Sequence, residues 1–278
     1  MINRMYREVL LLFIYTGGHM LINKIALIIS VTFLVFSTGK AANINNEFSA
    51  DAVMTIPGQP RTISKLFIGK DSVRTEVNTQ NGVMVDIVFP KEGRLIKLNP
   101  SVKQYIEIPI EKNNEDNDSK NNPCNRILNA TCTLMGNETV NGQETNKWKI
   151  VSIKDGKSIR TLHWVDTKRQ LAVREFFSDG SMAEMTLQKT EKINNRKTEK
   201  WVRRVSRPDG SSISSYQWYD PLLEISIKEE LPGGYIRELK NIKMGSQNES
   251  LFKIPENYKI MKQNTQQISP ENGYRQIK

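Results

Sequence analysis

An internal repeat in the C-terminal half of the chain constrains the fold more than any other feature. Residues 138–148 return 53 positions later as residues 191–201, with Glu, Asn, Thr, Lys and Trp at matching places. Further along, the Trp-x-Asp triplet at 164–166 is answered by one at 218–220. Self-similarity over such a distance is typical of a duplicated supersecondary unit. We therefore predict two related sheet units, over residues 138–187 and 191–241.

Each copy has the pattern of about four antiparallel strands. Side chains alternate along the runs with period two, so that Arg160, Leu162 and Trp164 share one face of a strand. Asp-Gly pairs at 155–156 and 209–210 separate two of the runs, and both residue types tolerate the positive φ of a hairpin turn. Tryptophans in strands usually fill a core, so the repeat by itself predicts structure and no site.

A first sheet unit is predicted over residues 46–110. It contains short apolar runs at 48–56, 65–70, 72–77, 83–90, 94–100 and 103–108. Turn signals such as Asn81-Gly82 separate them, and short strands at this spacing make a meandering antiparallel sheet that curls toward a barrel. Residues 133–262 complete the domain, with a last short strand over 251–258. The predicted fold class is all-β and mainly antiparallel, a strongly curved open sheet or half-barrel.

The N-terminus predicts export. An apolar run at 25–36 follows Lys24, and small residues at 38–42 allow cleavage after Ala41. Because residues 20–41 form a complete signal peptide, we expect translation to begin at Met20 and residues 1–19 to be a mis-assigned start. The alternative is an uncleaved anchor. We expect a periplasmic protein of a Gram-negative bacterium.

The chain carries a net charge of +10. It stays basic without the leader, since only Arg4, Arg7, Lys24 and Lys40 are lost against Glu8. An exported protein meets anionic lipid head groups rather than nucleic acid, so a peripheral contact with an anionic membrane surface is the partner that this charge favours. The charges are scattered along the sequence, which equally fits a solvated surface. We expect no nucleic-acid binding.

Residues 111–132 predict a polar loop closed by a disulfide. The stretch 111–123 has no large apolar residue, and Asp116 and Asp118 lack the glycine and terminal glutamate of an EF-hand loop, so we expect no metal. Cys124 and Cys132 are the two cysteines of the chain. In an exported protein they predict a disulfide, which stabilises by at most about 2–3 kcal/mol through loop entropy.

The sequence offers little for catalysis. Of its two histidines, His19 falls in the leader and His163 lies beside Trp164 in a predicted strand. A Gly-x-Ser-x-Gly elbow, a phosphate-binding glycine loop and cysteine-rich zinc patterns are all missing from the sequence. We therefore predict no catalytic residues, no cofactor and no enzyme. A hydrolase is the weakest alternative.

Several short motifs carry a family resemblance. They are Phe-Ser-Ala-Asp at 48–51, Lys-Leu-Phe-Ile-Gly at 65–69, Val-Arg-Thr-Glu at 73–76, the run from 94 to 105, and Phe-Lys-Ile-Pro-Glu-Asn-Tyr at 252–258. In these motifs the chain resembles the LolA/LolB-like superfamily of periplasmic proteins, over residues 46–260. It is most similar to an uncharacterised branch that is related to outer-membrane lipoprotein sorting.

The resemblance implies an unclosed, curved antiparallel sheet with a lid and an apolar cavity that holds acyl chains. Arg74 looks like the superfamily's early-strand arginine, which holds the lid or faces the ligand. The chain differs from the lipoprotein carriers in its duplicated unit, in the loop of Cys124 and Cys132, and in having no evident helical lid.

Two functional hypotheses follow. The first is a periplasmic carrier or sensor of a hydrophobic ligand, a lipid or a lipoprotein acyl chain, in which Arg74 pairs with an anionic head group. The expected wall residues are Phe67, Val73, Tyr105, Trp164 and Trp218. The second is an envelope module for protein interaction or assembly that binds no small ligand and docks a partner at an open sheet edge. We expect a monomer with a disordered tail over 263–278.

Overall fold

The computed structural model describes residues 46–110, 122–126, 130–154 and 156–261, with backbone alone at 125, 126 and 154. The predicted leader over 1–41, including the start at Met20, lies outside the described residues. So do the tail over 263–278 and most of the polar loop. These assignments stay predictions, as do the domain boundaries.

The described part of the chain is built almost entirely of strands. The N-terminal strands are β1 (Phe48–Thr55), β2 (Thr62–Ile68), β3 (Val73–Thr79), β4 (Gly82–Phe89), β5 (Arg94–Asn99) and β6 (Gln104–Pro109). The first copy supplies β7 (Ala130–Val140), β8 (Gln143–Lys154), β9 (Lys157–Asp166) and β10 (Ala172–Phe176). The remaining strands are β11 (Met182–Ile193), β12 (Arg196–Ser206), β13 (Ser212–Asp220), β14 (Ile225–Leu231), β15 (Tyr235–Met244) and β16 (Lys259–Ile260). Two short 3₁₀ helices, η1 (Pro123–Arg126) and η2 (Glu249–Phe252), are the helical elements of this part.

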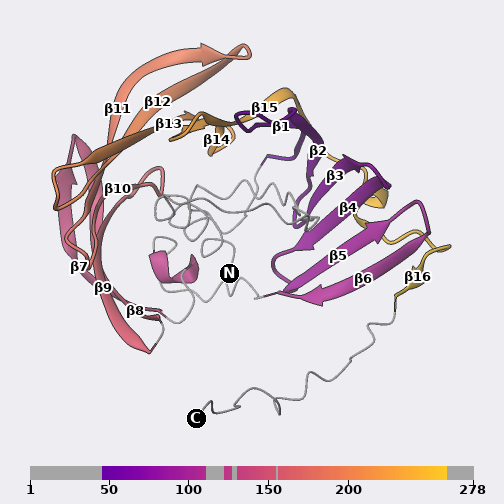
Figure 1. Cartoon of the computed structure of the whole chain (residues 1–278), viewed down its shortest axis with the longest axis horizontal. Coiled ribbons are helices and arrows are strands. Elements are labelled where there is room, and N and C mark those ends of the chain that lie inside the picture. Colours follow the sequence, from indigo (N-terminus) through magenta and orange to yellow (C-terminus); the bar gives the residue numbers. More distant parts are fainter. Residues whose placement is uncertain (1–45, 111–121, 127–129, 155, 262–278) are drawn as a thin grey trace, which may run out of the picture.

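All 16 strands belong to one sheet, in the order β16-β6-β5-β4-β3-β2-β1-β15-β14-β13-β12-β11-β10-β9-β8-β7. Every pair is antiparallel except β16 with β6. Most neighbours in the sheet are also neighbours in sequence, and the pairing of β1 with β15 joins the two halves of the chain. Figure 1 shows that the sheet curves strongly and stays open. The predicted all-β, mainly antiparallel, curved open sheet is confirmed.

The segment at 251–258 corrects one expectation. It forms no strand; η2 ends at Phe252, and the chain pairs with β6 only at Lys259–Ile260. Asn248 caps η2 by accepting a 2.9 Å hydrogen bond from the backbone N–H of Ser250. Pro255, which lacks a backbone N–H, cannot donate to a ladder, so local capping and proline together override the strand-like apolar pattern.

Local turn chemistry explains the long hairpins of the two copies. Asn141 and Gly142 both have positive φ, at 50° and 74°, at the tip between β7 and β8. Asn194 and Asn195, at 50° and 63°, do the same between β11 and β12. Two consecutive residues of positive φ make the hairpin turn whose twist matches that of the strands.

Irregularities of the ladder also recur at the repeat offset. A bulge lies between Leu134 and Gly136 in β7, and another between Leu187 and Lys189 in β11. A third bulge lies in β15, where Asn241 has a φ of 51° opposite β1. Because bulges set the twist and aim of neighbouring side chains, the two copies bend the sheet in the same way.

Strand alternation gives the sheet two faces, which we name after two residues of β2. Leu66 lies opposite Ala50 in β1 and Thr75 in β3, and these residues define the Leu66 face. Phe67 lies opposite Arg74, and these residues define the Phe67 face. Cross-strand partners share a face, so the assignment extends along the ladder from strand to strand.

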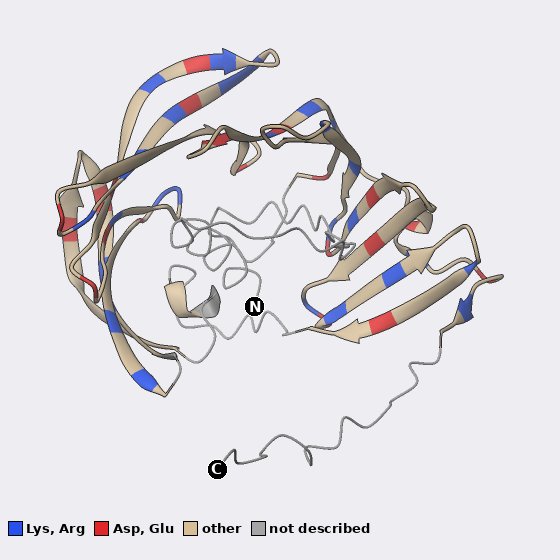
Figure 2. Ribbon diagram, in the orientation of Figure 1, with Lys and Arg blue, Asp and Glu red and all other residues tan. Residues whose placement is uncertain are grey.

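Charged residues are spread over the strands rather than gathered in one patch, as Figure 2 shows. Many basic side chains pair with acidic ones on neighbouring strands, for example Lys97 with Asp86 at 2.7 Å. No helix in the described ranges is long and apolar enough to cross a membrane.

Candidate functional site

The largest apolar cluster of the described chain lies on the Leu66 face where β1 joins the two halves of the sheet. Its buried members are Phe48, Ala50, Ala52, Leu66, Ile68, Val73, Val88, Leu223, Ile227 and Leu239. They come from β1 to β4, from β14 and β15, and from the turn before β14. Ala50 and Ala52, in the middle of β1, are the smallest side chains of the set. The side chains of this face therefore extend least from the sheet at the middle of β1. We call this set the Leu66 cluster.

The Phe67 face carries a second apolar cluster over β4 and β5, and the C-terminal segment packs on it. Val85, Ile87, Ile96 and Leu98 are buried there against Phe252, Ile254 and Tyr258. Arg74 donates from Nη1 to the backbone oxygen of Leu251 at 2.7 Å and from Nε to Glu76 at 2.8 Å. The C-terminal segment thus acts as a strap across this face, and the Arg74 guanidinium takes part in holding it.

The strap predicts a steric test at Gly69. A Cβ built at Gly69 would lie 2.8 Å from two ring atoms of Phe252, and the φ of Gly69 is outside the left-handed region. We therefore expect Gly69→Ala to destabilise the protein by about 1–3 kcal/mol through overpacking, measured by urea denaturation. Adding Phe252→Leu, which shortens the opposing side chain, should recover part of this loss. If Phe252→Leu lowers the stability of the Gly69→Ala variant further, the ring of Phe252 does not oppose position 69 as described.

In the first copy, Trp164 is held by a charged frame on the Phe67 face. Its indole Nε1 donates to Glu138 at 2.7 Å, and Lys147 pairs with the same carboxylate at 2.8 Å. The ammonium of Lys147 lies 4.8 Å from the Trp164 ring centroid, in cation–π range. Thr145 donates from its hydroxyl to the backbone oxygen of Glu138 at 2.6 Å. These contacts fasten β7, β8 and β9 to one another.

The second copy repeats most of this frame, but here Lys189 of β11 is the lysine that pairs with the Glu191 carboxylate, at 2.9 Å. Trp218 donates from Nε1 to Glu191 at 2.7 Å, and Thr198 donates to the Glu191 backbone oxygen at 2.9 Å. Lys200 lies 4.8 Å and Lys228 4.4 Å from the Trp218 ring centroid. The matching Glu, Thr, Lys and Trp of the sequence repeat are therefore the members of one structural frame that occurs twice.

The frames predict how stability depends on pH. Hydrogen bonds from Lys147 and then Trp164 hold the pKa of Glu138 below its ordinary value, and Lys189 and Trp218 do the same for the pKa of Glu191. A lowered folded-state pKa stabilises above the unfolded pKa, and this contribution is lost as the pH falls through the folded pKa. The stability difference between the wild type and Glu138→Gln/Glu191→Gln should thus be largest near neutrality and shrink toward about pH 3. Denaturant midpoints across this range measure it; a constant difference would contradict the frames.

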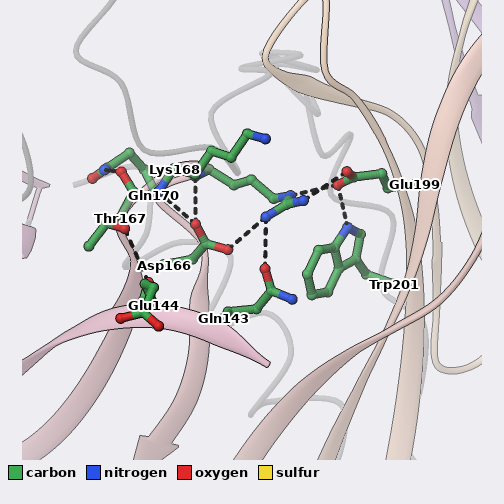
Figure 3. A network of polar contacts seen from close by, with 9 residues as sticks. Gln143, Glu144, Asp166, Thr167, Lys168, Gln170, Glu199 and Trp201 are labelled. Carbon is green, nitrogen blue, oxygen red and sulfur yellow. Dashed lines mark hydrogen bonds and ion pairs between the residues drawn. The ribbon is translucent and has the colours of Figure 1, made fainter. Parts of the chain in front are cut away.

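Between the copies lies a buried ionic network, drawn in Figure 3 around the labelled Gln143, Asp166, Glu199 and Trp201. Arg169, from the turn between β9 and β10, donates to Glu199 at 2.6 and 2.9 Å. It also donates to Asp166 at 3.0 Å and to Gln143 at 2.9 Å, and its guanidinium lies 5.3 Å from the Trp201 ring centroid. One side chain therefore joins β8 and β9 of the first copy to β12 of the second.

The network shifts the pKa values of its members. The hydrogen bonds with Glu199 raise the pKa of Arg169. Burial alone would raise the pKa of Glu199, but hydrogen bonds and the charge of Arg169 more than offset it, so the pKa of Glu199 lies below its ordinary value. Burial, reinforced by Glu224 and Glu199, raises the pKa of Tyr219 to about 12. All of these groups keep their ordinary neutral-pH charge, which is typical of a structural ion pair.

The disulfide predicted to close the polar loop over 111–132 is confirmed. Cys124 and Cys132 are bonded, with their Cα atoms 5.7 Å apart. Together they pack against the buried Trp148, Ile150 and Val165. In Figure 1, η1 lies on the inner side of the curved sheet at this end.

Within the described ranges no group of three or more His, Cys, Asp or Glu side chains could hold a metal ion. His163 lies with its Nδ1 3.7 Å from Glu175, which also pairs with Arg203 at 2.5 Å. Asp166, the other residue considered for a triad, is bound to Arg169 and caps the turn by accepting from the backbone N–H groups of Lys168 and Arg169.

Comparison with known proteins places the chain in a family. The profile described as "Domain of unknown function (DUF4412)" matches residues 51–258. The chain belongs to the DUF4412 family. No curated protein sequence matches it.

Solved structures similar to this DUF4412 protein include a LolA superfamily protein from Nitrosomonas europaea, at 11% identity and a TM-score of 0.33, covering 75% of this chain and 89% of the other. A putative outer membrane lipoprotein-sorting protein domain from Vibrio parahaemolyticus is 8% identical at a TM-score of 0.33, with 74% and 88% covered. The hypothetical lipoprotein YmcC from Escherichia coli is 12% identical at 0.27, with 72% and 85% covered. The comparison returns the superfamily that the strand motifs resemble; at these scores it assigns no function.

The six residues expected to contact a ligand do not come together in this DUF4412 protein. Val73 belongs to the Leu66 cluster. Phe67, Arg74 and Tyr105 lie on the Phe67 face, where Tyr105 and Arg74 contact the C-terminal strap region. Trp164 and Trp218 also follow the register of the Phe67 face, each inside its own charged frame. Their role in ligand binding stays a prediction.

Sequence reasoning missed two features. The Arg169 network was missed because Arg169 and Glu199 are 30 residues apart and belong to different copies. The alanines of β1 were missed as members of the Leu66 cluster, although two small residues at alternate positions of an apolar strand are a visible signal.

Proposed function

We propose that this DUF4412 protein is a carrier or sensor that binds a hydrophobic ligand, a lipid or a lipoprotein acyl chain, in the cell envelope. The observation that carries the proposal is the Leu66 cluster. It is a cluster of ten buried apolar side chains on one face of a single, strongly curved sheet, and two of its members are alanines of β1. Apolar contact of this kind stabilises a bound chain by about 25 cal/mol per Å² buried.

The ligand-facing residues that we propose are Ala50, Ala52, Leu66 and Val73 of the Leu66 cluster. Val73 keeps the role expected from the sequence. On this proposal Trp164 and Trp218 support the sheet from its other face, where lysines and glutamates already occupy both the ring faces and the indole N–H groups. Arg74 supports the ligand face indirectly by fixing the strap.

The subcellular localisation of the protein belongs to the same proposal. The leader over 1–41 supports export to the periplasm of a Gram-negative bacterium, and the basic balance that remains without the leader supports a peripheral contact with anionic lipid. The ionic network has the neutral-pH charges of a structural element, which supports a structural role for Arg169 and Glu199. We propose a monomer that collects its ligand at the membrane surface.

A larger side chain at Ala52 in the Leu66 cluster tests the proposal. Ala52→Phe places a large ring among buried neighbours and should weaken the binding of a fluorescent fatty acid at least about tenfold, equivalent to about 1.4 kcal/mol. Ile63→Phe is the matched control, because Ile63 lies on the Phe67 face at 54% exposure. Equal affinity in the two variants, with both folded by circular dichroism, would contradict the assignment.

The tryptophans distinguish the two faces. If the Leu66 cluster binds the ligand, Trp164→Ala and Trp218→Ala should change the fatty-acid affinity little, although they should lower the thermal midpoint. A large loss of affinity with an unchanged midpoint would favour the wall assignment made from the sequence and would move the ligand to the Phe67 face.

A second candidate function has an observation of its own, the open edge at β7. This strand is the last in the sheet order, spans 11 residues and has Glu138 as its single charged side chain. Leu134 and Met135 are 52% and 54% exposed beside its bulge. Long edges with few charges are templates for strand addition, so an envelope module that docks an extended partner segment is the alternative. Crosslinking from a photoreactive residue at Met135 in intact cells tests it.

A further inference from the structure

The tip of the first long hairpin docks on the second copy in a defined place. Val140, at the end of β7, is buried in one cluster with Met185 and Trp201. Asn141, the next residue, donates from Nδ2 to the backbone oxygen of Met185 at 3.4 Å. We call the place that receives a tip residue a turn socket, here formed by Met185 of the strand that receives the tip and Trp201 of the strand beside it.

The tip of the second hairpin docks in the same manner. Ile193, the counterpart of Val140, packs against the cluster that holds Leu239. Asn194 donates from Nδ2 to the backbone oxygen of Leu239 at 3.2 Å. Leu239 is the counterpart of Met185 at the offset of 54 that also relates Trp164 to Trp218. Two successive hairpins therefore fill two successive sockets with an aliphatic side chain followed by an asparagine.

The first copy contains the same socket with a different occupant. At the offset of 53, Met185 corresponds to Cys132 and Trp201 to Trp148. Both lie in one cluster, where Cys124, from η1, packs together with Ala130. Cys124 thus lies where Val140 and Ile193 lie in the other two sockets.

We propose that the segment carrying Cys124 is the end cap of the repeat array. It fills the first turn socket in place of a hairpin tip, and the disulfide to Cys132 holds it there. In an array of repeats each unit shields its neighbour, so the first unit needs a cap that a preceding unit would otherwise provide. A hairpin tip is held by the ladder of its own two strands, whereas η1 spans only four residues and pairs with no strand. A covalent bond at the socket substitutes for that ladder. The inference does not rest on the proposed ligand.

Hydrogen exchange measured by mass spectrometry on three variants tests the cap. Cys124→Ser/Cys132→Ser removes both the bond and the apolar contact, and exchange over 130–154 should become at least about tenfold faster. Residues 182–206, the corresponding hairpin of the second copy, are the internal control and should change less than about twofold. Cys124→Val/Cys132→Met copies the pair of Val140 and Met185 without a covalent bond, and it should restore part of the lost protection.

Each of three contrary results would overturn the proposal that the segment carrying Cys124 caps the array. If the serine variant exchanges like the wild type over 130–154, Cys124 does not shield the first socket. If both hairpins lose protection equally, the disulfide stabilises the fold globally and not at the socket. If the Val/Met variant exchanges as fast as the serine variant, the disulfide is a covalent tether and Cys124 does not fill the socket by packing.

Discussion

Replacing Trp201 with alanine is expected to lower the free energy of unfolding by about 3–5 kcal/mol, a large part of the stability of a domain. Trp201 is fully buried and packs with Val140, Met185 and Tyr219 at the contact between the two copies. The substitution removes this packing, the hydrogen bond that the indole N–H donates to Glu199 at 3.2 Å, and the aromatic face beneath Arg169. Chemical denaturation of the purified protein measures the change.

The control for Trp201→Ala is Leu222→Ala. Leu222 is 72% exposed in the turn before β14, so its truncation should change stability by less than about 0.5 kcal/mol. If Trp201→Ala costs no more than Leu222→Ala, the two copies do not share the core described above.

Replacing Arg169 with methionine is expected to cost about 3 kcal/mol, because it leaves two carboxylates without their cation. The side chain of Asp166 is almost completely buried and that of Glu199 is largely buried. Methionine keeps the length and much of the packing of the arginine stem, so the loss reports the charge rather than a cavity. Urea denaturation at neutral pH measures it.

Two further variants show whether burial gives the Arg169 network its strength. Arg174→Met removes a comparable pair with Glu184, but that pair is partly exposed and should be worth about 0–1 kcal/mol. Arg169→Met/Glu199→Met removes one of the stranded carboxylates and should be more stable than Arg169→Met alone. Equal costs for Arg169→Met and Arg174→Met would contradict a buried network.

The two copies share a frame but supply its cation differently. In the first copy Asp166 pairs with Arg169 of the following turn. In the second, Asp220 pairs with Arg196 of β12, while Leu223 takes the place of Arg169 and joins the Leu66 cluster. Arg196 in turn takes the place of Gln143. The second copy thus keeps a cation beside its Asp220, supplied by Arg196, while the turn residue Leu223 is apolar and belongs to the Leu66 cluster.

Local patterns are what the sequence predicts well here. Two-residue alternation and Asn-Gly or Asn-Asn turns set the strands and hairpins, because both depend on neighbouring residues alone. The pairing of Cys124 with Cys132 followed from there being two cysteines in a chain with a predicted export signal. The strand expected over 251–258 was wrong, since the Asn248 cap and Pro255 decide that segment.

The face of the sheet on which a side chain lies depends on the register between strands, and the sequence does not show the register. Val73 lies between Ser72 and Arg74, and Trp164 lies between His163 and Val165. Neither context shows that the two side chains follow opposite faces of the sheet. The pairing of β1 with β15, which assembles the Leu66 cluster, joins residues nearly 200 positions apart. Likewise, the contact of Arg169 with Glu199 exists only once the two copies are packed side by side.

Native mass spectrometry with organic extraction, on the protein purified without detergent, tests the central claim most directly. A hydrophobic ligand held by the Leu66 cluster predicts a stoichiometric lipid or acyl mass on the wild type, with occupancy lost in Ala52→Phe and retained in Ile63→Phe. A wild-type protein that carries no lipid, and that takes up none from vesicles containing anionic lipid, would contradict the claim and favour the docking module at β7.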